Sequence, residues 1–214
     1  MEHLQQIFEK CRRYGLSLNP KKSHFSLKEG KLLDHIVSKE GVNIDPSRVE
    51  ESKKIPLPRN KKEIQSFLGR INFLRIFVPN YAEITKGITD MLKEGVEVKW
   101  NSIAKESFSR FKVALQESPL LVIPDYKNPF QLFSFASAST IATLLLQRNE
   151  EGREQLVAFF SRVLRDVELK YNILEKEAYA LVKALKAFRV YILQSQVTAY
   201  VPNATIKYVL FRVI

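Results

Sequence analysis

The spacing of hydrophobic residues changes in character near residue 128. Before that point, apolar residues recur every three or four positions over most of the chain, which predicts helices. After it, apolar residues come in short runs of the kind that forms strands. The first helical pattern lies at the N-terminus, where Gly15 follows as a C-cap; its apolar face consists of Leu4, Ile7, Phe8, Cys11 and Tyr14.

Residues 16–44 are predicted to form a hairpin. We expect short strands at 23–26 and 32–37, on either side of a turn at Glu29-Gly30, with the next turn at Gly41. A helix and a hairpin are too thin to bury a core by themselves, so this segment must pack against another part of the chain.

Residues 45–118 are predicted to be mainly helical, with breaks at 45–47 and 55–58. Asn60, with Glu63 three residues later, resembles a capping box. Pro79-Asn80 ends that helix, and two more are expected at 84–92 and 100–115. Five phenylalanines at helical spacing are predicted to pack in the core rather than to stack on bases: Phe67, Phe73, Phe77, Phe108 and Phe111.

The remainder of the chain combines strands with one long helix. Residues 130–135, 142–147 and 156–160 are predicted as successive strands, with a hairpin turn at 149–152. A helix at about 173–192 and a fourth strand at about 196–201 follow. Together with the helices before them, these elements predict an α+β fold.

Charge and composition limit the classes of binding partner that we expect. The 214 residues carry a formal net charge of +11, which suggests a polyanionic partner, most simply nucleic acid; a solvated basic surface is the alternative. The one cysteine excludes an internal disulfide framework and a cysteine-rich zinc site. No export signal or run of roughly 20 apolar residues is visible. We therefore expect an intracellular chain, cytoplasmic or nuclear, with no membrane partner.

Eight segments resemble, in the same order, those of the Pol polyprotein of gypsy-type long-terminal-repeat retrotransposons. They are residues 16–25, 34–49, 63–81, 100–115, 118–126, 135–147, 158–164 and 171–193. The resemblance implies a palm-end helix and hairpin over residues 1–55 and a helical thumb and connection over 56–118. It further implies an incomplete RNase H-like mixed sheet with one long helix over 119–214.

The family synthesises DNA on RNA and hydrolyses RNA–DNA hybrids, and it uses magnesium ions held by carboxylates for both reactions. The resemblance places the last polymerase aspartates upstream of the residue that matches His3. We therefore expect this chain to have no polymerase activity and no magnesium of its own. Template-dependent primer extension above a heat-killed control would refute this.

The nuclease positions can be compared residue by residue. Phe135 stands where the family has its first aspartate, Glu177 matches the second carboxylate, and Pro202 stands at the third. The fourth belongs to a later helix. With one ligand of four, we expect no intact catalytic or metal site, although the family is enzymatic. Glu177 is then explained as a residue near a positive helix N-terminus or as a partner of Lys176 or Lys183. Phe135 is expected to fill the old pocket as a core residue.

Basic clusters can outlast the loss of catalytic groups, because phosphate contacts need only a cation near the backbone. The residues concerned are Lys21, Lys22, Lys53, Lys54, Arg59, Lys61 and Lys62. In the family, these surfaces face the primer–template duplex, so we expect salt-sensitive binding of RNA–DNA or DNA duplexes. Asp34 replaces the usual glycine of a Leu-Gly-His hairpin and adds a negative charge there.

Two hypotheses remain open. The chain is either a degenerate piece of a retrotransposon reverse transcriptase and RNase H, or a co-opted noncatalytic module that binds nucleic acid or protein. A co-opted module should fold cooperatively, whereas a decaying piece should expose an orphan edge of its sheet.

Overall fold

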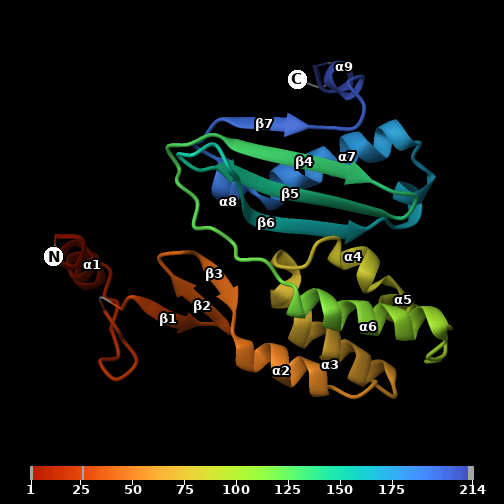
Figure 1. Ribbon diagram of the computed structural model, residues 1–214, viewed down its shortest axis with the longest axis horizontal. Coiled ribbons are helices and arrows are strands. Elements are labelled where there is room, and N and C mark those ends of the chain that lie inside the picture. The colour runs from red at the N-terminus through yellow and green to blue at the C-terminus, as the bar shows by residue number, and fades with distance from the viewer. Residues whose placement is uncertain (1, 26, 212–214) are drawn as a thin grey trace.

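The computed structural model describes residues 2–25 and 27–211. The N-terminal part begins with α1 (Glu2–Arg13), which stands apart from the rest of the molecule (Figure 1). Three short strands follow, β1 (Glu29–Leu32), β2 (His35–Ser38) and β3 (Val42–Ile44), and they form an antiparallel sheet in that order. Val42 exchanges backbone hydrogen bonds with Leu121, at 2.7 and 3.0 Å, which fastens this small sheet to the middle of the chain.

The predicted hairpin turn at Glu29-Gly30 is wrong. Both residues lie in β1, and the turn is formed instead by Leu33 and Asp34, at φ 47° and 66°. Positive φ at both central residues is what a type I′ hairpin requires, and it is normally supplied by glycine or asparagine. Leucine gives no sequence signal for such a turn, and the nearest glycine, Gly30, lies within β1. The second predicted turn, at Gly41, is confirmed by its φ of 147°.

The helical part lies below the larger sheet in Figure 1. It consists of α2 (Pro46–Lys54), α3 (Lys61–Ile71), η1 (Asn72–Ile76), α4 (Tyr81–Ile84), α5 (Lys86–Thr89), η2 (Asp90–Leu92) and α6 (Ser102–Gln116). The predicted cap of α3 is confirmed, because the Asn60 side chain accepts a hydrogen bond from Glu63 N at 2.9 Å. The break expected at 45–47 is instead the start of α2, with Asp45 as N-cap and Pro46 in the first turn.

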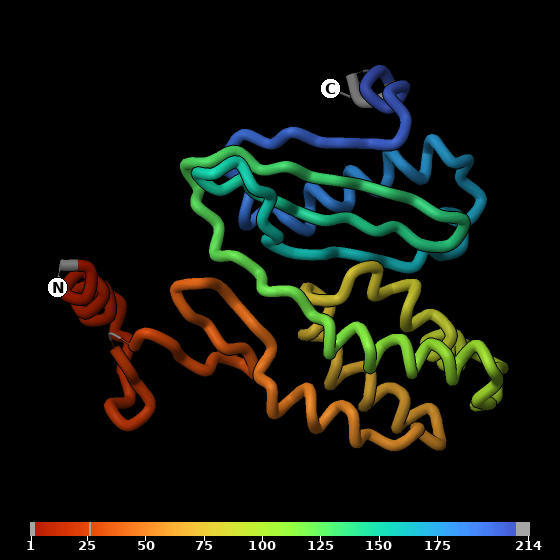
Figure 2. Tube along the Cα trace, viewed as in Figure 1, coloured from red at the N-terminus to blue at the C-terminus, as the bar shows by residue number. Residues whose placement is uncertain are grey.

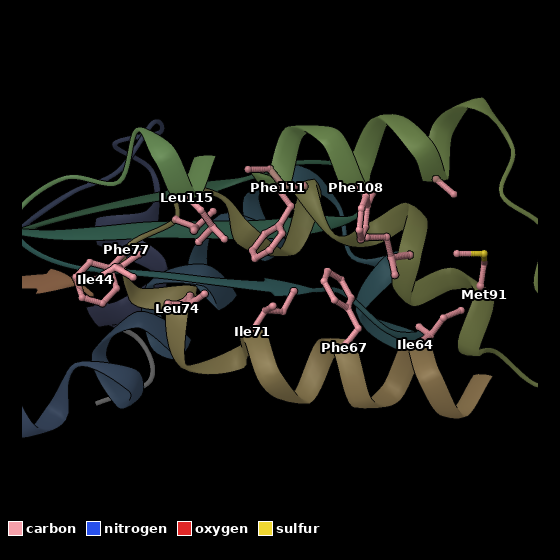
Figure 3. Packing of buried hydrophobic residues seen from close by; sticks show 14 of the residues in the cluster. Ile44, Ile64, Phe67, Ile71, Leu74, Phe77, Met91, Phe108, Phe111 and Leu115 are labelled. Atoms are coloured by element: carbon pink, nitrogen blue, oxygen red, sulfur yellow. The ribbon is translucent and has the colours of Figure 1, made fainter. Parts of the chain in front are cut away.

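Phenylalanine rings fill the interior of the helical part (Figure 3). Phe67 packs against Phe108 and Phe111, with ring centroids 5.3 and 5.9 Å apart. These three rings and Phe77 are buried, as predicted, and Phe73 is half-buried against them. The same cluster includes Ile44 and Leu121, so this core also holds the end of the small sheet.

The larger sheet has four strands in the order β6-β5-β4-β7. The strands β4 (Phe130–Ala136), β5 (Thr140–Arg148) and β6 (Glu154–Val163) are antiparallel, and β7 (Val197–Tyr200) runs parallel to β4. Helices α7 (Ile173–Ala187) and α8 (Arg189–Ile192) cover one face, behind the sheet in Figure 1, and α9 (Ile206–Phe211) follows β7. A 3-10 turn, η3 (Asp166–Lys170), joins β6 to α7.

The strands of the larger sheet, the 149–152 turn and the mixed α+β architecture are as predicted. The strand expected at 23–26 is wrong over residues 23–25, which lie outside any strand, and residue 26 lies outside the described residues. No helix among residues 2–25 and 27–211 is long and apolar enough to cross a bilayer.

The sheet rests on the helical part along strand β6, where Figure 2 shows the two traces side by side. Ala82 N donates to Ser161 Oγ at 2.9 Å, and Arg75 donates to Ser161 O at 3.1 Å. Thr140 Oγ1 donates to the Glu83 carboxylate at 3.0 Å. These bonds place η1 and α4 directly against β6 and hold the two parts together.

Candidate nucleic-acid interface

One end of the larger sheet gathers the three positions that matched nuclease carboxylates. Phe133 pairs with Tyr200 across the parallel strands β4 and β7, so Phe135 and Pro202 both lie two residues further toward the same end. The start of α7 lies over this end, because Lys176 Nζ donates to Ala138 O at 2.8 Å in the loop after β4. The topology therefore brings these three positions to the same end of the sheet.

The prediction that Phe135 is a core residue is wrong, because its side chain is 47% exposed. Side chains alternate along a strand, and the α7 side of β4 is taken by Phe130 and Leu132, which belong to the same buried cluster as Leu181 of α7. Phe135 therefore lies on the other face, which neither α7 nor α8 covers. On that face Phe133 stacks on Tyr200, with ring centroids 4.5 Å apart and the planes at 10°. The sequence shows the alternation but not which face is covered.

Glu177 lies on the covered face and is buried, with 7% of its surface exposed. Its Oε2 has no hydrogen-bond partner among the described residues. Within the described residues it forms no ion pair with either predicted partner, since Lys176 bonds to Ala138 and Lys183 stands over the Tyr179 ring. Both predicted roles of Glu177, as a helix-end residue and as a paired one, therefore fail to explain its burial.

The helix end is capped by a different glutamate. Glu175 accepts from Asn172 N at 2.9 Å, and the Asn172 side chain accepts from Glu175 N at 3.0 Å, which together form a capping box. In the described part of the chain, no group of three or more His, Cys, Asp or Glu side chains stands close enough to hold a metal ion. Glu177 thus remains a single buried carboxylate.

Two of the three predicted basic clusters come together. Lys53 and Lys54 end α2, and Arg59, Lys61 and Lys62 lie at the start of α3, so all five surround the short link between these helices. We call these five residues the basic face. Lys21 and Lys22 are exposed in the loop after α1, which lies on the far side of the small sheet from the helical part (Figure 1), and they do not join the basic face.

The cations of the basic face differ in how they are held. Lys53 pairs with Glu50, and Lys61 Nζ donates to Lys93 O at 2.7 Å. The side chains of Lys54, Arg59 and Lys62 make no ion pair with any described residue and are exposed. These three are the cations of the basic face that are available to a phosphate.

The negative charge that Asp34 adds to the hairpin is compensated. Arg48 Nε donates to Asp34 Oδ1 at 2.7 Å, while another nitrogen of the same guanidinium donates to Glu51 at 2.6 Å. These two carboxylates raise the pKa of Arg48 above its usual value. The neighbouring His35 is packed between Phe73 and Phe77, and burial lowers its pKa. The hairpin tip itself is apolar, since Leu33 is 82% exposed.

Sequence analysis missed a second group of cations, at the junction of the helical part and the sheet. Arg75, Arg162 and Arg165 line one groove there, together with Lys93. They are isolated in the sequence and form no run of basic residues, so charge patterning gave no signal for them.

Comparison with known proteins agrees with this architecture. Residues 100–199 match the family model described as an RNase H-like domain found in reverse transcriptase. The chain is 36% identical over 199 residues to the retrovirus-related Pol polyprotein from transposon 297 of Drosophila melanogaster, covering 91% of this chain and 18% of that protein. It is 26% identical to the transposon Tf2-3 polyprotein of Schizosaccharomyces pombe, covering 90% of this chain and 14% of that protein.

Two solved structures of a foamy viral protease-reverse transcriptase are also similar. A form in complex with double-stranded DNA has a TM-score of 0.75 at 28% identity, covering 97% of this chain and 37% of that one. A form in complex with an RNA/DNA hybrid has a TM-score of 0.73 at 30% identity, covering 93% and 27%.

Fold, strand order and relatives together define a reverse transcriptase segment with an RNase H-like domain. The chain belongs to the Pol polyproteins of gypsy-type long-terminal-repeat retrotransposons, and it spans less than a fifth of the length of the transposon relatives named above.

Proposed function

We propose that this chain binds the backbone of RNA–DNA or DNA duplexes through the basic face and has no nuclease activity of its own. The observation that carries the proposal is the contrast between the two regions. The nuclease end presents an exposed phenylalanine and a proline where carboxylates are needed, whereas Lys54, Arg59 and Lys62 stand exposed and without a partner among the described residues.

Phosphate binding needs far less geometry than hydrolysis. Hydrolysis through two magnesium ions requires several carboxylates at fixed separations, and one buried glutamate does not supply them. A lysine or arginine near the duplex favours binding because it releases condensed counterions from the phosphates, whatever the sequence of the bases. The net charge of +11 favours approach to any polyanion. The foamy viral relatives were solved with such duplexes, which supports the same class of ligand here.

Fluorescence anisotropy with a short labelled RNA–DNA hybrid tests the proposal across a series of salt concentrations. If about six phosphates are contacted, affinity should fall by about a thousandfold between roughly 50 and 200 mM salt. Charge reversal at Lys54, Arg59 and Lys62 should flatten that dependence and weaken binding. A matched control reverses three exposed cations outside the basic face, namely Lys105, Arg110 and Lys186.

The control variant changes the net charge by the same amount. It therefore distinguishes binding at the basic face from a general attraction between a positive protein and nucleic acid. Equal losses in the two variants would refute the basic face as the binding site. Magnesium-dependent cleavage of the hybrid by the wild-type chain would refute the absence of nuclease activity.

A further inference from the structure

A groove of about 760 Å³ lies where the helical part meets the sheet. Its walls come from η1, α4 and η2 on one side and from β6 and η3 on the other. Ligand sites in proteins are commonly about 300–1,000 Å³ and often lie at such junctions. We call it the junction groove.

The lining of the junction groove is more positive than negative. It contains four cations, Arg75, Lys93, Arg162 and Arg165, and two anions, Asp90 and Asp166. Lys93 is neutralised by Asp90, whose carboxylate is 2.7 Å from its Nζ. The Arg162 guanidinium is already bound on its other side: one nitrogen lies 2.5 Å from the Tyr179 hydroxyl and another lies 3.0 Å from the Glu168 carboxylate. Arg75 and Arg165 remain as the cations without a carboxylate partner among the described residues.

The two arginines differ in how firmly their side chains are held. Arg75 is fixed, since it donates to Ser161 O at 3.1 Å and its guanidinium lies 5.4 Å from the centre of the Phe160 ring. A guanidinium has five N–H donors, so most of its donors are still free. The Arg165 side chain is exposed and can move toward a ligand. A guanidinium binds the paired oxygens of a phosphate especially well.

The junction groove also continues the basic face. Lys61 donates to the carbonyl of Lys93, so the rim of the groove touches a residue of the basic face. Strands β4 and β6 are both antiparallel to β5, so Arg165 lies at the same end of the sheet as Phe135. A strand that leaves the basic face can therefore enter the groove toward the nuclease end.

We propose that the junction groove binds the phosphates of a nucleic-acid strand that extends from the basic face, with Arg75 and Arg165 as the contacting cations. The proposal rests on duplex binding by the basic face. The proposal adds a second phosphate site next to the basic face. One of its cations, Arg75, comes from the helical part, and the other, Arg165, follows the last residues of strand β6 in the larger sheet.

Arg165→Gln tests the groove without disturbing the fold, because Arg165 is exposed and forms no ion pair with a described residue. Its affinity for the hybrid should fall about threefold to tenfold at low salt, and the slope of log affinity against log salt should decrease by about one. Arg110→Gln, an exposed arginine on α6, serves as the matched control and should change neither quantity.

A second readout does not depend on variants. Phenylglyoxal modifies accessible arginines, and mass spectrometry reports each site. The hybrid should protect Arg165 but leave Arg110 reactive. A short single-stranded oligonucleotide and inorganic phosphate form two further arms, which distinguish a strand from a free phosphate as the ligand.

The outcomes separate this proposal from the one on which it rests. If the hybrid binds and Arg165 is neither protected nor needed, the junction groove proposal is wrong while the basic face stands. If the hybrid does not bind but the oligonucleotide protects Arg165, duplex binding by the basic face is wrong, and so is the extension of a strand from that face into the groove. Protection by inorganic phosphate alone would identify a phosphate site and overturn the assignment to a strand.

Discussion

Replacing the buried Glu177 by methionine should stabilise the chain. Glu177 is 7% exposed, and its Oε2 has no hydrogen-bond partner in the described part of the chain. A buried polar group without a partner costs about 1–3 kcal/mol, and methionine has nearly the same length without that polar group. We therefore expect Glu177→Met to raise the free energy of unfolding by about 1–3 kcal/mol.

The control is another glutamate on the same helix. Glu175 is paired with Asn172 in a capping box, so Glu175→Met removes one hydrogen bond and a negative charge from the first turn. This change should lower the free energy of unfolding by about 0.5–1 kcal/mol. The same substitution at two positions two residues apart is thus expected to change the free energy of unfolding in opposite directions.

Urea denaturation monitored by circular dichroism measures both variants, with the midpoint compared at an unchanged slope. In a chain of this size, each kcal/mol corresponds to about 2–4 °C in melting temperature. A destabilised Glu177→Met would show that the carboxylate has a favourable partner in solution. Magnesium identifies one such partner, because a bound ion would raise the wild-type melting temperature and leave the Met variant unchanged.

Three further changes follow from positions that the structure defines. Phe135→Asp should lower the free energy of unfolding by only about 1 kcal/mol and give no hybrid cleavage, since the ring is 47% exposed; a loss of 3 kcal/mol or more in urea titration would show a buried ring. Leu33→Asn should raise the melting temperature, because leucine at φ 47° costs about 1–2 kcal/mol and its exposed side chain gains little; an unchanged or lower value contradicts this. Burial lowers the pKa of His35, so the folded state disfavours the charged ring; stability should be full above pH 6.5 and decline as the pH falls below it. His35→Phe should flatten that decline, and an unaltered pH profile would exclude His35 as its source.

Much of the fold follows from local spacing. The change from helical to strand periodicity near residue 128 predicted both the order of elements and the α+β class, because each period is a property of neighbouring residues. The cap at Asn60 and the turn at 149–152 were likewise predicted, since a few adjacent residues are enough to form them. The hairpin turn was not, because Leu33 carries no mark of a left-handed conformation.

Tertiary structure determines those features of the candidate site that depend on which surfaces pack together. Alternation along β4 shows that Phe135 and Leu132 lie on opposite faces, but only the packing of α7 shows which face is buried. The burial of Glu177 depends on the same contact. The junction groove combines Arg75 with Arg165, which are far apart in sequence and meet only because η1 and α4 pack against β6. The sequence determines what each segment can form, whereas burial and the convergence of charges depend on long-range packing.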